Sequence, residues 1–131
     1  MGRSLGSAAA LEIAARADPN LAGVIIESGF AYTFDLIERI GFVQLPDAFE
    51  QQDGFGNLEK IARTDAPTLI LHGDRDLLIP VTDAVALYEA SPSRRKTLLR
   101  IPGAGHNDLM LVGQREYFAA IAAFCGQRPA A

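Results

Sequence analysis

The sequence contains a single cysteine and no apolar run long enough to cross a membrane. One cysteine, Cys125, excludes an internal disulfide and a cysteine-based metal site, and such usage is typical of the reducing cytoplasm. Basic residues are also scarce, because 12 Lys and Arg stand against 16 Asp and Glu, for a net charge of −4. Nucleic-acid surfaces need clustered cations, so we expect no nucleic-acid partner. These absences predict a cytoplasmic protein without a membrane span.

The high apolar content of the chain predicts one globular domain rather than a disordered chain. Of the 131 residues, 49% are hydrophobic and 21% are charged, so the chain is able to bury a single core. The predicted strands are apolar, β-branched runs at residues 21–27, 67–73 and 97–101. The predicted helices are residues 4–17, 57–62, 80–90 and 113–125. This alternation predicts a three-layer α/β/α fold with a partial parallel sheet and right-handed crossovers.

Aromatic residues concentrate between residues 30 and 56, where the chain shows no regular periodicity. Six of the ten aromatic residues lie in this segment, so it must cover something apolar. One interpretation is one or two small helices packed on the edge of the sheet. The other is a cap over a substrate pocket, because concave sites are lined mainly by apolar and aromatic groups. On this second interpretation, the residues that line the pocket are Phe30, Tyr32, Phe34 and Phe42.

The C-terminal end of the chain is predicted to be a helix followed by a short tail. Tyr117, Ile121 and Phe124 recur on one face of this helix, which indicates that this face packs on the sheet. We expect Cys125 to lie on the same inner stripe as a small buried hydrophobic residue. Residues 126–131 are expected to form a frayed tail.

Residues 2–6 read Gly-Arg-Ser-Leu-Gly, a Gly-x-Ser-x-Gly pattern at the start of the first predicted helix. This pattern is typical of a nucleophile elbow, a sharp strand-to-helix turn that exposes a serine Oγ, here that of Ser4. Flanking glycines allow close backbone packing in such a strained turn. The backbone N–H of Leu5, at the positive end of the helix, is a candidate donor to an oxyanion. The same five residues also fit a Gly/Ser-rich arm that caps a helix.

Two later loops supply the other groups that a serine nucleophile needs. A base must take the serine proton, and a carboxylate must orient that base. Asp74, Asp76 and His106 all follow predicted strands, and ligands of parallel sheets bind beyond the carboxyl ends of the strands. The order Ser, Asp, His is the one expected for an α/β-hydrolase. The second histidine, His72, ends a predicted strand and is expected to have a structural role.

With these three motifs in order, the chain resembles the α/β-hydrolase family, in the C-terminal half of its domain. The matching stretches are residues 2–7 (GRSLGS), 72–80 (HGDRDLLIP) and 103–106 (GAGH). In the family's HGxxDxxxP loop the acid is the Asp four residues after the His, which implies Asp76 and leaves Asp74 as a turn residue. The resemblance is to small bacterial serine hydrolases. It implies a Ser4, Asp76 and His106 triad acting on small-molecule acyl esters or thioesters, without a cofactor or metal.

The resemblance starts at the elbow, so the family's first strands and the loop that gives a second oxyanion donor have no counterpart. We therefore expect a three-stranded sheet with an open edge, which favours self-association, and at best very weak activity for the isolated chain. Two other interpretations stay open. One is a non-catalytic hydrolase-derived fragment or interaction module. The other is a metal-dependent phosphoesterase, whose candidate ligands are His72, Asp74, Asp76, His106 and Asp108.

Overall fold

The sheet of the computed structural model, which describes residues 1–46 and 54–126, is parallel and has the strand order β1-β2-β3-β4. Its strands are β1 (Gly2–Arg3), β2 (Val24–Glu27), β3 (Thr68–Gly73) and β4 (Lys96–Ile101). Three of them confirm predicted strands, while β1 corrects the expectation of a three-stranded sheet. The two residues ahead of Ser4 suffice to extend the ladder, because Gly2 pairs with Ile26 and Arg3 with Glu27.

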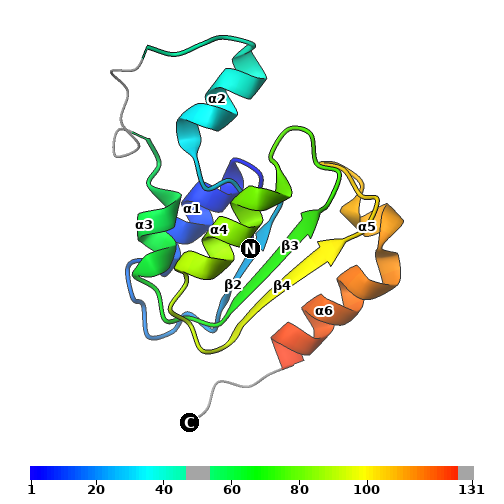
Figure 1. The fold of residues 1–131 in the computed structure, drawn as a ribbon. Helices are drawn as coiled ribbons and strands as arrows, with labels where there is room; N and C mark the ends of the chain where they lie inside the picture. The colour runs from blue at the N-terminus through cyan, green and yellow to red at the C-terminus, as the bar shows by residue number, and fades with distance from the viewer. Residues whose placement is uncertain (47–53, 127–131) are drawn as a thin grey trace.

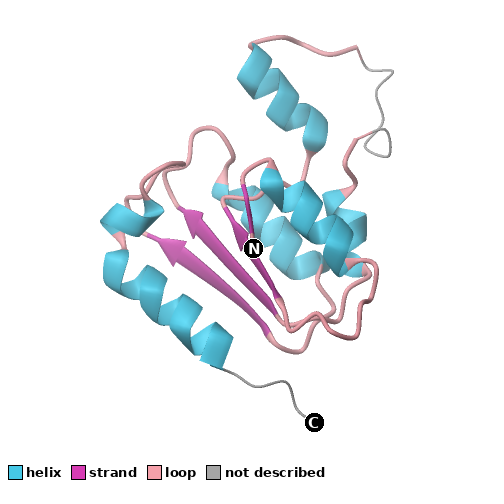
Figure 2. Ribbon diagram, turned by 180° about the vertical axis from the view of Figure 1, so that it is seen from behind, coloured by secondary structure: helices cyan, strands magenta, loops and turns pink. Residues whose placement is uncertain are grey.

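Helices lie on both faces of this sheet, which confirms the predicted three-layer α/β/α fold. The helices of the described residues are α1 (Gly6–Ala14), α2 (Thr33–Gly41), α3 (Asn57–Ala62), α4 (Val81–Ala90), α5 (Leu109–Val112) and α6 (Gln114–Gly126). Helices α1, α3 and α4 cover one face and α6 covers the other, as the views from the front and from behind agree (Figures 1 and 2). Within the described ranges, no helix has the length and apolar character needed to traverse a bilayer.

The central strand β3 is buried along its whole length because it packs against both helical layers. Ile70 points into the core shared with α1, α3 and α4, whereas Leu69 and Leu71 point into the core shared with α6. This alternation follows from the two-residue period of a strand. Each such fully buried side chain contributes about 1.5–3 kcal/mol of transfer free energy. The residues that follow β3 are therefore carried on the most firmly packed element of the fold.

Helix α1 and strand β2 are shorter than predicted because the backbone turns inside the apolar runs. Helix α1 begins at Gly6 rather than at residue 4, since Ser4 has a φ of 52° and stands outside the helix. It ends at Ala14, before Ala17, whose φ of 53° is also left-handed. Strand β2 begins at Val24 rather than at residue 21, because the Leu21 N–H donates to a carbonyl three residues earlier in a turn.

The last predicted helix, residues 113–125, is present as α6, and the short helix α5, which was not predicted, precedes it and is separated from it at Gly113. A Cβ at Gly113 would lie 2.5 Å from Cγ2 of Ile101, so only glycine lets the chain pass this close to β4. Helix α5 consequently begins directly after the loop that carries His106. The break places that loop and the start of α6 against the end of the sheet.

The prediction for Cys125 is wrong, because the structure leaves this residue exposed. The inner face of α6 is formed by Tyr117, Ile121 and Phe124, which pack into the same core as β3. Cys125 follows Phe124 by one residue, a rotation of about 100° around the helix, which turns its side chain away from the sheet. The predicted tail begins at Gly126, the last residue of α6, and residues 127–131 lie outside the described part of the chain.

The predicted cap segment contains one described helix, α2, which stands apart from the three layers (Figure 1). The start of the segment is held to the body by two hydrogen bonds. The Asp83 carboxylate accepts a bond from the backbone N–H of Ala31, with a length of 3.0 Å. The side chain of Asn57, the first residue of α3, donates to the Phe30 carbonyl at 2.8 Å. Residues 47–53 of the segment lie outside the described residues, and its role as a cap stays a prediction.

Candidate active site

Ser4 lies on a sharp turn between β1 and α1. Its φ of 52° belongs to the left-handed region, which non-glycine residues rarely adopt and which costs about 1–3 kcal/mol. Two backbone bonds hold this conformation. The Ser4 N–H donates to the carbonyl of Glu27 at 2.9 Å, and the Ser4 carbonyl accepts from Ser7 N–H at 3.0 Å. The strand, turn and helix that the Gly-x-Ser-x-Gly pattern predicts are therefore present.

The two glycines of this pattern differ in their surroundings. A Cβ at Gly2 would collide with the carbonyl oxygen of Gly6 and lie 2.6 Å from the Cβ of Ala10, so α1 approaches β1 too closely for any side chain. A Cβ at Gly6 would meet no heavy atom within 4 Å among the described residues. The expected packing role of the flanking glycines holds for Gly2, and for Gly6 it is wrong.

Asp76 sits in the loop after β3, and its side chain is fully buried. Its Oδ1 accepts hydrogen bonds from the backbone N–H groups of Leu78 and Ile79, at 2.9 and 2.8 Å. Its Oδ2 lies 2.7 Å from Nδ1 of His106. One carboxylate oxygen thus fixes the loop, and the other is left for the histidine.

Asp74 has a different position, although it precedes Asp76 by only two residues. Its Oδ1 accepts a hydrogen bond of 2.7 Å from the backbone N–H of Gly103, in an exposed setting. This bond ties the loop after β3 to the turn after β4. Of the two candidate acids, the structure brings Asp76 to His106 and uses Asp74 to connect two loops.

His106 lies between the carboxylate and the serine. Its Nδ1 is 2.7 Å from Oδ2 of Asp76, and its Nε2 is 3.0 Å from Oγ of Ser4. An ionised carboxylate only accepts hydrogen bonds, so Nδ1 carries the proton and, in the neutral ring, Nε2 is free to accept the Ser4 hydroxyl proton. The histidine side chain is 11% exposed, so this chain of bonds is shielded from water but reachable from it. The arrangement has the geometry of a nucleophile, a base and an acid in series.

His72 packs behind this group without reaching the serine. Its ring is fully buried, and Nε2 donates to the carbonyl of Ile79 at 2.8 Å. The same nitrogen lies 3.5 Å from Oδ2 of Asp76. The contacts agree with the structural role predicted for this residue.

A second polar cluster beside Ser4 was missed by the sequence reasoning. The guanidinium of Arg3 donates from Nε to Glu27 at 3.2 Å, and from Nη2 to the His106 carbonyl at 2.9 Å and to Asn107 Oδ1 at 2.7 Å. The hydroxyl of Tyr117 donates to the other oxygen of Glu27 at 2.7 Å. Burial, followed by this bond to a carboxylate, raises the pKa of Tyr117 to about 12. The one sequence signal was a lone acidic residue ending an apolar strand.

The other predicted site residues are dispersed. Phe30 is fully buried in the core, with its ring edge-to-face with that of Phe55 at 5.9 Å between centroids. Tyr32 and Phe34 are partly buried, whereas Phe42, just after α2, is 95% exposed. The structure therefore does not gather the four pocket residues around one space, and their contact with substrate stays a prediction. Leu5 directly follows Ser4 and is exposed, and its role as an oxyanion donor stays a prediction.

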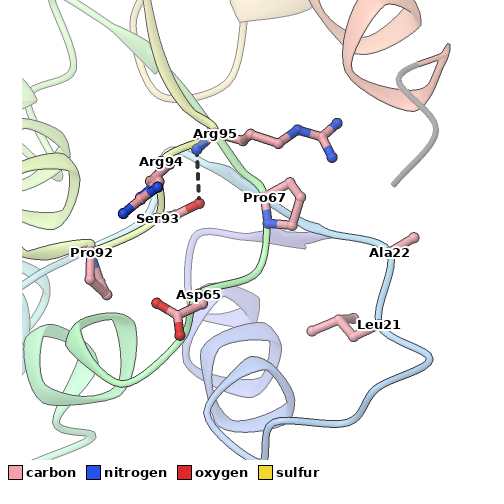
Figure 3. A pocket seen from close by; sticks show the side chains of 8 residues that line it. All are labelled: Leu21, Ala22, Asp65, Pro67, Pro92, Ser93, Arg94 and Arg95. Carbon is pink, nitrogen blue, oxygen red and sulfur yellow. Dashed lines mark hydrogen bonds between the residues drawn. The ribbon is translucent and has the colours of Figure 1, made fainter. Parts of the chain in front are cut away.

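A pocket with a volume of about 550 Å³ lies at the opposite end of the strands (Figure 3). Its lining residues precede β2, β3 and β4, whereas the serine, aspartate and histidine group follows the strands. This pocket is therefore separate from that group. Its lining consists of Leu21, Ala22, Asp65, Pro67, Pro92, Ser93, Arg94 and Arg95.

The candidate metal ligands of the phosphoesterase interpretation are not assembled. Among residues 1–46 and 54–126, no three His, Cys, Asp or Glu side chains form a group that could hold a metal ion. Asp74 instead bonds to the Gly103 backbone, and Asp108 accepts the Gly105 N–H at 2.6 Å. These carboxylates shape loops.

Comparison with known proteins decides the family. A profile described as serine aminopeptidase, S33, matches residues 56–110. The alpha/beta hydrolase domain-containing protein aho-3 of Caenorhabditis elegans is 33% identical over 110 residues, which are 84% of this chain and 31% of that protein. The human alpha/beta hydrolase domain-containing protein 17B is 35% identical over 115 residues, 86% of this chain and 36% of that protein. This chain belongs to the α/β-hydrolase family.

A solved structure shows the same fold at lower identity. The monoacylglycerol lipase of Paleococcus ferrophilus superposes with a TM-score of 0.70 at 17% identity, over 94% of this chain and 66% of that one. This α/β-hydrolase chain spans about a third of the length of the curated relatives that it matches, 31% and 36% of them.

Proposed function

We propose that this α/β-hydrolase chain carries the reacting groups of a serine hydrolase that cleaves acyl esters or thioesters. One observation carries the proposal: Ser4 Oγ, His106 and the buried Asp76 carboxylate form a continuous chain of hydrogen bonds of 3.0 and 2.7 Å. These residues come from three loops, at three separate places in the sequence. The left-handed φ of 52° at Ser4 supports the proposal, because backbone strain of this kind clusters at functional sites.

The proposed reaction follows from the direction of these bonds. Ser4 Oγ attacks the acyl carbonyl carbon, and its proton passes to Nε2 of His106. The same nitrogen then protonates the departing alcohol or thiol, leaving the acyl group on Ser4. Water, deprotonated by His106, hydrolyses this acyl-enzyme. Asp76 keeps the imidazole in the required tautomer and stabilises its charged form without itself taking up the proton.

The negative charge that develops on the acyl oxygen needs hydrogen-bond donors. The Leu5 N–H is the candidate donor in this chain, since it follows the nucleophile at the start of α1. The positive end of the dipole of α1, a helix of nine residues, adds to the field at that position. A single such donor contributes about 2.7–4 kcal/mol of transition-state stabilisation in related chemistry.

The acyl substrate class rests on the chemistry of the three groups. A serine, a histidine and a carboxylate in series perform acyl transfer and do not need a cofactor. The likeness to a monoacylglycerol lipase supports an ester as the bond that is cleaved. A thioester reacts through the same tetrahedral intermediate, so both belong to the proposal.

The test is labelling of the purified chain with a fluorophosphonate. The Ser4 Oγ forms a bond to phosphorus as fluoride leaves, and His106 takes the hydroxyl proton. We expect labelling at Ser4, its loss in Ser4→Ala, and slowing by several orders of magnitude in His106→Ala. The double variant should be little different from Ser4→Ala, because triad members act as a unit.

Ser7 provides the matched control, since it is the other serine of the elbow and its side chain is buried. The Ser7→Ala variant should label at the same peptide and with the same rate constant as the parent chain. A folded chain that leaves Ser4 unlabelled, or labels it equally fast without His106, contradicts the proposal. Such a result favours the alternative of a hydrolase-derived interaction module.

A further inference from the structure

Arg3 occupies the first variable position of the Gly-x-Ser-x-Gly pattern and reaches across to the histidine loop. Its Nη2 donates both to the backbone carbonyl of His106 and to the side chain of Asn107, at 2.9 and 2.7 Å. These bonds join residues more than 100 positions apart in the sequence. They connect the residue just before the nucleophile to the main chain of the proposed base.

Two further side chains orient the Arg3 guanidinium. Glu27, the neighbour of Arg3 in the parallel ladder, accepts its Nε–H at 3.2 Å and is 7% exposed. Tyr117 of α6 donates to the second oxygen of Glu27 at 2.7 Å and is also 7% exposed. Each carboxylate oxygen is thus assigned to one partner. A planar guanidinium suits this arrangement because its donors point in fixed, diverging directions.

We infer that Arg3, oriented by Glu27 and Tyr117, is a positioning residue that sets the distance between Ser4 and His106. This inference rests on the proposed function, in which Ser4 and His106 react together. Arg3 and its hydrogen bonds to His106 and Asn107 form a clamp between the serine and the histidine loop. This clamp acts on both Ser4 and His106, since Arg3 adjoins Ser4 through the backbone and holds the His106 carbonyl through a hydrogen bond. Other bonds of the histidine loop, from Gly103 to Asp74 and from Gly105 to Asp108, fix the chain ahead of the histidine. The Arg3 bond fixes the histidine residue itself.

The energetic importance of the clamp follows from the geometry that it controls. The hydrogen bond from Ser4 Oγ to His106 Nε2 is 3.0 Å long and depends on where the loop backbone lies. A displacement of about 1 Å between reacting groups lowers a rate by roughly 10²-fold. Loss of the clamp should therefore slow reaction at Ser4 while leaving the fold in place, because the side chain of Arg3 is 44% exposed and lies outside the core.

The test compares Arg3→Met with the parent chain and with Arg115→Met, a matched removal of an arginine. Arg115 is exposed and pairs only with the adjacent Glu116 in the described structure. Two quantities are measured: the rate constant of fluorophosphonate labelling at Ser4, and deuterium exchange of the peptide spanning residues 103–108. We expect Arg3→Met to slow labelling by about 10- to 100-fold and to increase exchange in that peptide. Arg115→Met should change neither.

A conservative variant and a double variant separate positioning from a loss of charge or fold. Arg3→Lys keeps the charge, but one ammonium group lacks the fork that joins Glu27 to the loop, so it should remain slow. Tyr117→Phe should slow labelling less than Arg3→Met. If Tyr117 acts through Glu27 and Arg3, the Arg3→Met/Tyr117→Phe double variant should be no slower than Arg3→Met alone.

The outcomes separate the clamp from the proposed reaction. If the parent chain labels at Ser4 with His106 dependence, an Arg3→Met variant with parental labelling and exchange overturns the clamp and leaves the triad intact. If the parent chain does not label, the proposed function fails, and the exchange measurement alone decides the clamp. When the parent chain does not label, deuterium exchange of residues 103–108 that is unchanged in Arg3→Met likewise refutes the clamp. Should Arg3→Met fail to fold, the same two measurements on Arg3→Lys decide.

Discussion

Replacing Asp76 with asparagine is the substitution that the site predicts most sharply, because the two oxygens of the carboxylate have different partners. Oδ1 accepts two backbone N–H groups at 2.9 and 2.8 Å, and Oδ2 faces Nδ1 of His106 at 2.7 Å. Asparagine has an NH₂ group in place of one carboxylate oxygen, so its amide has two possible orientations at this site. Its NH₂ group will face either the loop backbone or the histidine.

The backbone N–H groups that Asp76 accepts determine which orientation the amide adopts. An NH₂ turned toward Leu78 and Ile79 would leave one buried and one partly buried N–H group without an acceptor, at a cost of about 1–3 kcal/mol for the buried one. The amide oxygen therefore stays with the backbone, and the NH₂ donates to Nδ1 of His106. The ring must then carry its proton on Nε2, where the base should accept one from Ser4. We expect a rate loss of about 10⁴-fold, or roughly 5.4 kcal/mol, as for other triads with the wrong tautomer.

The assay is the second-order rate constant for fluorophosphonate labelling of Ser4, with Asp74→Asn as the matched control. Asp74 accepts one exposed bond from Gly103, and an asparagine retains an oxygen for it. The control should lose at most about tenfold, the equivalent of one hydrogen bond. Comparable losses in the two variants, or a larger loss for Asp74→Asn, would refute the assignment of Asp76 as the acid.

Two other predictions concern stability. Gly2→Ala should lower the free energy of unfolding by about 1–3 kcal/mol, because its Cβ meets the Gly6 carbonyl and Ala10, whereas Gly6→Ala has room for its Cβ and should be neutral or stabilising. Denaturant titration measures both variants, and equal losses of stability would contradict the packing argument. Burial raises the pKa of Asp83, so between the unfolded and folded pKa values the folded state binds a proton that the unfolded state releases. The stability that this proton binding contributes is lost as pH rises from about 4 through the raised pKa. Relative to Asp83→Asn, the parent chain should therefore lose stability over that range, and a difference between the two that does not vary with pH would oppose the assignment.

Those features of the fold that depend on local sequence were predictable. The apolar run ending at His72 became β3, because its residues are buried whichever helices cover them. Residues 57–62 and 81–90 also form helices, within one residue of the predicted ranges. The register of β1 was not predictable, since a two-residue strand has no periodicity. Its pairing with β2 is set by the elbow that follows it.

The candidate site also contains residues that local sequence predicts and residues that it does not. Ser4, Asp76 and His106 each stand in a short motif, and the motif order predicted that these three side chains lie together, as their hydrogen bonds show. Cys125 was misplaced because its position on α6 differs from that of Phe124 by a single step of rotation, and apolar residues on several sides of the helix blur the buried stripe. The four aromatic residues were grouped by composition, which carries no information on where each ring lies.

The Arg3 cluster shows why a motif is an incomplete description of a site. Its three main members come from β1, the end of β2 and the first turn of α6, and they meet only after the sheet has paired and α6 has docked. Nothing in the spacing of these residues indicates a contact. Since the motif admits any residue between its first glycine and the serine, each chain is free to build a different support there. In this chain an arginine at that position connects the strand that carries the proposed nucleophile to the loop that carries the proposed base.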